Sequence, residues 1–125
     1  MVVGPERRKR KASEKKILMY KPSLQQQVLL LKRYSDKYDV EGTDCFSDIL
    51  AIPAAMIVLD PEQLSFPEME QMSEAFKFDS DTVIVFTGYV SPKYYGVLGP
   101  VTDSMFNERM KYHIVKDLEK LDVDI

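Results

Sequence analysis

Two apolar runs without alternating polar residues dominate the hydrophobic pattern of the chain. Residues 54–60 (AAMIVLD) and 82–87 (TVIVFT) are apolar at nearly every position. Strands of this kind are typical of parallel sheets that helices cover on both faces. A shorter apolar run at 17–20, which ends before Pro22, predicts a first strand, and residues 40–46 predict a weaker edge strand.

Helical spacing of apolar residues follows the first of these strands. Ser23, with Gln26 three residues later, forms a capping-box pattern, so we expect a helix to begin there. Apolar side chains then recur every three or four residues, which predicts an amphipathic helix over 23–38. The side chains expected on its apolar face are Leu24, Val28 and Leu31, with Leu29 and Leu30 widening that face.

The remaining pattern predicts a short helical turn at 46–50, a helix at 67–77, a short strand at 94–98 and a last helix at 104–121. Strands and helices therefore alternate along the chain. This order predicts an α/β fold, a three-layer α/β/α sandwich around a mostly parallel sheet of four to five strands, as in flavodoxin.

Four segments carry a resemblance to a known family: KILM at 16–19, PAAMIVLD at 53–60, VIVFT at 83–87 and VLGP at 97–100. They look like the first, third, fourth and fifth strands of the receiver domains of two-component response regulators. The resemblance covers about residues 16–121. In that family the third strand ends in the phospho-accepting aspartate and the fourth in a switch hydroxyl. The resemblance therefore implies Asp60 and Thr87 as a candidate phospho-site.

Other members of that family's phosphorylation set are missing. Residues 20–22 (YKP) stand where the family has the acidic pair that holds Mg²⁺, and Gly99 replaces its lysine. Phosphoryl transfer depends on metal and lysine to neutralise charge, so the resemblance implies a vestigial phospho-site. Each candidate also has a purely structural explanation. Asp60 can cap the turn at Pro61, and Thr87 is a β-branched residue that strands favour.

Charge divides the chain into a basic start and an acidic remainder. The net charge of the 125 residues is −3, but residues 1–16 carry +5 and residues 17–125 carry −8. We expect residues 1–15 to be a disordered basic arm and residues 16–125 to be a single α/β domain. The candidate nucleic-acid contacts of the arm are Arg7, Arg8, Lys9, Arg10 and Lys11. The acidic body argues against a broad nucleic-acid surface, so such contact would be weak.

The segment after the second apolar run is rich in tyrosine beside proline and glycine. Tyrosine is enriched at protein interfaces because it combines a large contact area with a polar tip. We therefore predict an interface for a protein partner or a second copy of the chain, built from Tyr89, Tyr94, Tyr95 and Met105. The alternative is that these tyrosines pack over the open end of the sheet.

Catalytic and metal-binding patterns are not evident. Cys45 is the only cysteine and His113 the only histidine, and no motif links them, so we expect no catalytic residue, metal or cofactor. A single cysteine favours a reducing, cytoplasmic environment. No apolar run reaches the length that crosses a bilayer, so we expect no membrane partner.

The functional expectation is a non-catalytic, receiver-like interaction or regulatory module that works without phosphorylation. Two alternatives stay open. One is a small phospho-accepting or metal-dependent enzyme centred on Asp60. The other is a DNA-associated accessory protein that uses the basic arm.

Overall fold

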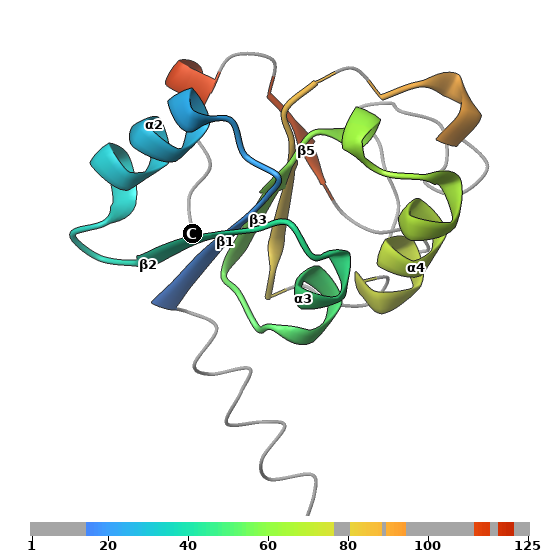
Figure 1. Cartoon of the computed structure of the whole chain (residues 1–125), viewed down its shortest axis with the longest axis horizontal. Coiled ribbons are helices and arrows are strands. Elements are labelled where there is room, and N and C mark those ends of the chain that lie inside the picture. Colours follow the sequence, from blue (N-terminus) through green and yellow to red (C-terminus); the bar gives the residue numbers. More distant parts are fainter. Residues whose placement is uncertain (1–14, 77–80, 89, 95–111, 116–117, 122–125) are drawn as a thin grey trace, which may run out of the picture.

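A parallel sheet forms the centre of the fold. The computed structural model describes residues 15–76, 81–88, 90–94, 112–115 and 118–121. Within these residues five parallel strands pair in the order β2-β1-β3-β4-β5 (Figure 1). The strands are β1 (Lys16–Tyr20), β2 (Asp39–Thr43), β3 (Met56–Leu59), β4 (Val83–Phe86) and β5 (His113–Ile114). The predicted α/β sandwich with a flavodoxin-like parallel sheet is confirmed.

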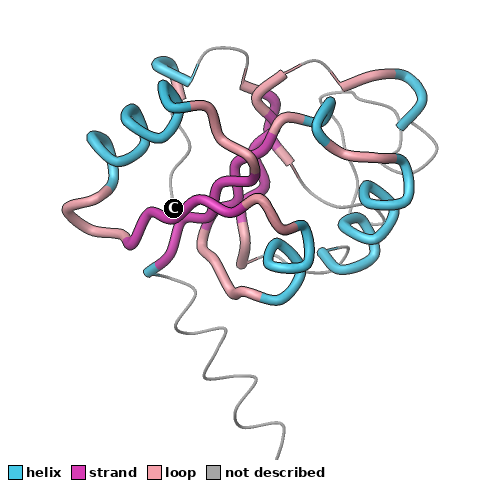
Figure 2. Tube along the Cα trace, viewed as in Figure 1, coloured by secondary structure: helices cyan, strands magenta, loops and turns pink. Residues whose placement is uncertain are grey.

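Helices lie on both sides of this sheet (Figure 2). The α-helices are α2 (Leu24–Tyr34), α3 (Phe46–Ala51) and α4 (Phe66–Phe76), and the 3₁₀ turns are η2 (Pro61–Gln63), η3 (Pro92–Tyr94) and η4 (Leu118–Lys120). Figure 1 shows α2 and η4 on one side, with α3 and α4 on the other. The predicted capping box is confirmed: Ser23 Oγ accepts from the backbone N–H of Gln26, and Gln26 Oε1 accepts from that of Ser23.

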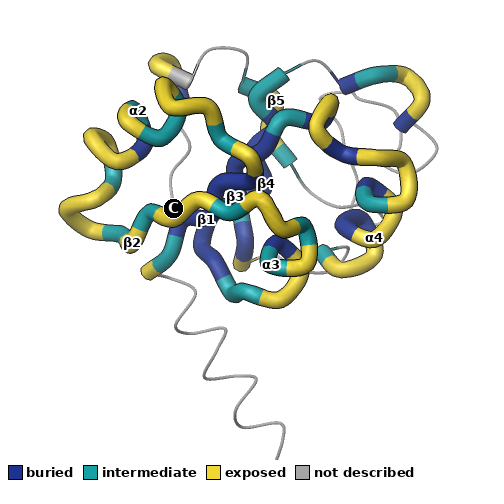
Figure 3. Tube along the Cα trace, viewed as in Figure 1, coloured by how far each residue is buried: buried dark blue, intermediate teal, exposed yellow. Residues whose placement is uncertain are grey.

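Two apolar cores result, because successive residues of a strand point to opposite faces of the sheet. Ile57 and Leu59 of β3 pack in the core that α3, α4 and η3 cover. Met56 and Val58 of the same strand pack in the core beneath α2 and η4. All four residues of β3 are buried, and Figure 3 shows the strand in the colour of buried residues. The unbroken apolar run in the sequence therefore reflects burial on both faces.

The side of α2 that packs on the sheet is not the one that the hydrophobic spacing predicted. Leu30 is the residue that α2 buries fully. Leu24, Val28 and Leu31, which we expected on the buried face, are 75%, 56% and 43% exposed. That expectation is wrong because α2 carries apolar residues on two sides and the sheet can bury only one of them.

The C-terminal part of the chain also differs from the prediction. Residues 113–114, expected within a helix over 104–121, form β5, which pairs with β4. The backbone N–H of Val115 donates to the carbonyl of Phe86 at 2.8 Å, so the segment satisfies the open edge of β4. Helical spacing gave no sign of this long-range pairing. A strand was expected at 94–98. Its first residue, Tyr94, belongs to the 3₁₀ turn η3, and residues 95–98 lie outside the described residues.

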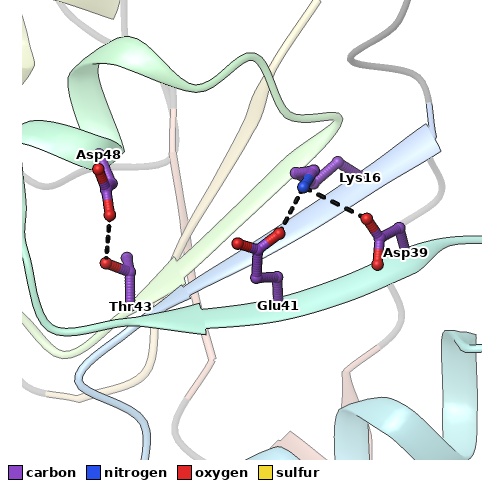
Figure 4. Close-up of polar contacts among 5 residues, drawn as sticks. All are labelled: Lys16, Asp39, Glu41, Thr43 and Asp48. Carbon is purple, nitrogen blue, oxygen red and sulfur yellow. Dashed lines mark hydrogen bonds and ion pairs between the residues drawn. The ribbon is translucent and has the colours of Figure 1, made fainter.

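An ion pair ties the edge strand β2 to its neighbour. Lys16 Nζ of β1 donates to a carboxylate oxygen of Glu41 and lies 3.3 Å from Asp39 Oδ2, both on β2 (Figure 4). The hydrogen bond to Glu41 is the main cause that raises the pKa of Lys16 above its ordinary value. Where β2 ends, Thr43 Oγ1 donates to Asp48 Oδ2 of α3 at 2.6 Å. Polar contacts thus hold a strand whose side chains are half-buried or exposed.

The packing of α2 predicts opposite results for two neighbouring leucines. Leu30→Ala is expected to lower the free energy of unfolding by about 3 kcal/mol, because it leaves a cavity in the core. Leu31→Ala is the matched control and is expected to change it by no more than about 0.5 kcal/mol, because Leu31 faces solvent. Urea unfolding of both variants measures the difference, and equal losses would contradict the observed orientation of α2.

The Lys16 ion pair predicts a stability difference that depends on pH. A raised pKa in the folded state means that the contribution is complete below the unfolded pKa of about 10.4 and is lost as pH rises through the higher folded pKa. Unfolding of the native chain and of Lys16→Met, measured between about pH 9 and pH 12, should therefore converge at high pH. A constant difference across that range would show that the charge of Lys16 contributes nothing.

Candidate functional site

The carboxyl ends of the parallel strands lie along one edge of the sheet, which we call the carboxyl edge. The chain reverses the direction in which it adds strands between β1 and β3. The chain passes from β1 to β2 on one side of this point, and from β3 to β4 on the other. Open α/β sheets bind their ligands at such a switch point, beyond the carboxyl ends of the strands. Here the side chains that directly follow the two strands are Lys21 and Asp60.

Asp60 acts as the cap of a turn. Its Oδ1 accepts a hydrogen bond from the backbone N–H of Glu62 at 2.9 Å, at the start of the 3₁₀ turn that begins with Pro61. A Cβ placed on Gly88, which follows β4, would lie 3.0 Å from the same oxygen. A larger residue at position 88 would therefore have to displace the carboxylate. The structural explanation for Asp60, a strand-end cap, is confirmed.

Thr87 lies at the same edge as Asp60. Its backbone N–H donates to the carbonyl of Leu59 at 3.0 Å, so the ends of β3 and β4 stay in register up to both candidates. Within the part of the chain that the structure describes, Thr87 Oγ1 is buried and has no hydrogen-bond partner. The fold thus brings the two predicted phospho-site residues to neighbouring strand ends.

The residue after β1 is a cation in an uncommon backbone conformation. Lys21 has a φ of 46°, in the left-handed region that costs a residue other than glycine about 1 kcal/mol. Its backbone N–H donates to the carbonyl of Thr43 at 2.8 Å, and its Nζ lies 5.3 Å from the centre of the Tyr20 ring. Over the described ranges, no three His, Cys, Asp or Glu side chains gather in a way that could hold a metal ion.

Tyr94 does not belong to an exposed interface. Its side chain is 1% exposed, its hydroxyl donates to the carbonyl of Leu64 at 2.6 Å, and its ring stacks on Phe66 at 6.3 Å between centres. The expectation of an exposed tyrosine here is wrong, because Tyr94 packs into the core beside η2 and α4. The other predicted interface residues, Tyr89, Tyr95 and Met105, lie outside the described residues, as do Arg7, Arg8, Lys9, Arg10 and Lys11.

Cys45 and His113 are placed on opposite edges of the sheet. Cys45 is exposed between β2 and α3, and its Sγ lies 2.9 Å from Ser47 Oγ. His113 is exposed on β5, at the far edge, and does not lie in the helix expected over 104–121. The structure does not bring the two together as a nucleophile and base.

The structure exposes an apolar surface on α2 that the sequence pattern had assigned to the core. Leu24, Val28 and Leu31 lie at positions i, i+4 and i+7 of α2 and form an exposed apolar row, which we call the α2 stripe. The sequence did contain a signal for it. Residues 28–31 (VLLL) are four consecutive apolar residues, and four consecutive positions of a helix cannot all face one side.

Comparisons with known proteins found no match: neither a family model, nor a curated protein, nor a solved structure is similar to this chain. Among the helices of the described part, none has the length and apolar character needed to span a membrane. The surfaces and contacts of the chain itself are therefore the basis for its functional interpretation.

The buried hydroxyl of Thr87, for which the described part of the chain offers no hydrogen-bond partner, predicts an unusual response to substitution. Thr87→Val is expected to leave the free energy of unfolding unchanged or to raise it by about 1 kcal/mol, because a buried hydroxyl without a partner is removed. The matched control is Thr82→Val, at the other end of β4, where Oγ1 donates to the carbonyl of Ala54 at 2.9 Å. This control should lose about 1 to 2 kcal/mol in urea unfolding. A comparable loss for both variants would show that the Thr87 hydroxyl has a partner.

Proposed function

We propose that this chain is a non-catalytic regulatory module of receiver-like architecture that acts by binding a protein partner, without phosphorylation. The observation that carries the proposal is the α2 stripe. Isolated exposed apolar side chains are ordinary, but three large ones in a row on one helix form a contiguous patch. Anchors at i, i+4 and i+7 are also the spacing by which helices engage partner surfaces.

The rigidity of α2 supports this interpretation. The opposite side of the helix is held in the core by Leu30, and Arg33 Nη1 donates to the carbonyl of Glu119 at 3.2 Å, which ties α2 to η4. The stripe is therefore presented on a fixed element, so a partner would not have to order it. Preorganised surfaces retain more of their interaction energy on binding.

The role of Asp60 supports the non-catalytic part of the proposal. Its carboxylate is used as a backbone cap, and the residue at the Mg²⁺-holding position of the receiver pattern is the cation Lys21. A cation at that position would repel a metal ion. These two features favour a receiver-like scaffold over a phospho-accepting enzyme.

Val28→Asp tests the proposed binding surface. The variant places a charge at the centre of the α2 stripe and is expected to reduce the capture of bound proteins from a host lysate by more than about tenfold, measured by quantitative mass spectrometry. Gln71→Asp is the matched control, because it adds the same charge to an exposed residue of α4, on the other side of the sheet. If both variants capture the same proteins as the native chain, the stripe is not the binding surface.

A second candidate function is favoured by the buried hydroxyl of Thr87, which has no hydrogen-bond partner among the described residues and lies at the strand end next to that of Asp60. In a phospho-accepting enzyme this hydroxyl would bind a phosphoryl oxygen on the Asp60 carboxylate. Beryllium fluoride with Mg²⁺, a phosphoryl mimic, should then shift the amide NMR signals of both residues, and Asp60→Asn should abolish the shift. For the binding module we expect no shift at millimolar mimic.

A further inference from the structure

We infer that residues 7–11 (RRKRK), which lie outside the described residues, dock along the outer edge of β2 as an added antiparallel strand of the same chain. Their basic side chains then contact the carboxylates of Asp39 and Glu41. This placement goes beyond the proposed binding function and does not depend on the α2 stripe. Three features support it: an open strand edge, an excess of carboxylates beside it, and the point at which the chain enters β1.

The outer edge of β2 presents backbone groups that have no partner in the described part of the chain. β2 is the outermost strand, and β1 pairs with it on one side. Alternate residues of a strand direct their backbone groups to opposite edges. Because the N–H of Lys21 donates to the carbonyl of Thr43, the groups of Thr43 and Glu41 face β1, and those of Val40 and Gly42 face outward. Such an edge is a template for a further strand.

The carboxylates beside this edge outnumber the cation that binds them. Asp39 and Glu41 lie on the same face of β2, opposite to Val40, which packs on the α2 side of the sheet. Both contact the single ammonium group of Lys16, so two negative charges share one positive charge (Figure 4). The side chains of Asp39 and Glu41 remain 69% and 46% exposed. Each can therefore accept a second cationic donor from the outer side.

The start of β1 lies within reach of this edge. Lys16 is in register with Asp39, so the chain enters β1 beside the amino end of β2. An added strand outside β2 would lie two strand spacings, about 10 Å, from β1. Residues 12–15 can span up to about 13 Å when extended, which is enough to cross the end of β2. Residues that precede this crossing would run antiparallel to β2.

The length and charge of residues 7–11 match the edge. The run has five consecutive basic residues, and β2 has five residues. Alternate side chains of a strand share a face, so either register places at least two basic side chains on the face of Asp39 and Glu41. Opposite charges at facing positions stabilise paired strands, and charged donors form strong hydrogen bonds with carboxylates.

A second copy of β2 fits the same edge less well. A symmetric antiparallel pair that joins the outward groups of Val40 to those of Gly42 in the other copy would place Glu41 opposite Glu41. Like charges directly opposite each other destabilise paired strands. Residues 7–11 bring the opposite charge, and their connection to β1 keeps them at a high effective concentration near the edge.

Hydrogen exchange of backbone amides, followed by NMR on the full chain, tests the docking. The amides of Val40 and Gly42 should exchange at least about tenfold more slowly than in a full-chain variant with a neutral run. That variant combines Arg7→Gln, Arg8→Gln, Lys9→Gln, Arg10→Gln and Lys11→Gln. The Glu41 amide, which faces β1, is the internal control and should exchange equally in both proteins. Equal rates at Val40 and Gly42 in the two proteins would overturn the inference.

A second pair of variants separates strand pairing from a loose electrostatic contact. Proline has no backbone N–H to donate, and one of two adjacent residues faces β2 in either register. Arg8→Pro combined with Lys9→Pro should therefore remove the protection of Val40 and Gly42. Arg8→Ser combined with Lys9→Ser loses the same charge and should keep most of it. Equal protection in the two variants would overturn the added strand.

The dependence on concentration decides which chain supplies the run. Docking within one chain predicts the same protection from about 0.05 mM to about 1 mM protein. Protection that rises over this range, together with a dimer in sedimentation equilibrium, would assign the edge to another copy and overturn docking within the chain. Circular dichroism of each variant checks that the domain is folded.

Discussion

Burial of β3 on both faces is the constraint on which the rest of the structure depends. Its four residues are apolar and buried, and it lies between β1 and β4 at the centre of the sheet. Backbone groups in such a position can be satisfied only by neighbouring strands, and the side chains need a helical layer above and another below. The two cores and the common direction of the strands follow from this requirement.

The parallel arrangement also determines what the carboxyl edge contains. Residues that follow β1, β3 and β4 meet there, which places Lys21, Asp60 and Thr87 near one another although they are far apart in sequence. Proximity alone does not produce chemistry. Asp60 is engaged as a cap, and a Cβ on residue 88 would lie 3.0 Å from its Oδ1, so glycine at this position leaves room for the carboxylate. The contacts observed at this edge are those of a turn cap.

Only one side of α2 can pack on the sheet, and this limit explains why the α2 stripe is exposed. A helix can place about half of its circumference against a sheet, so apolar residues beyond that half remain exposed. In α2 the core takes Leu30 and its neighbours and leaves Leu24, Val28 and Leu31 outside. Folding does not account for the exposed row, and the proposed association with a partner would account for it.

The sequence by itself determined the central architecture, because the unbroken apolar runs that became β3 and β4 are compatible with burial on both faces and little else. It also determined the start of α2, where Ser23 and Gln26 form a local capping box. Tertiary structure alone decided which side of α2 faces the core and that residues 113–114 pair with β4. The physical reason is the sequence separation over which each interaction acts. Helix caps and apolar runs involve residues within a few positions of one another. Strand pairing and the choice between two apolar helix faces depend on segments far away in the chain.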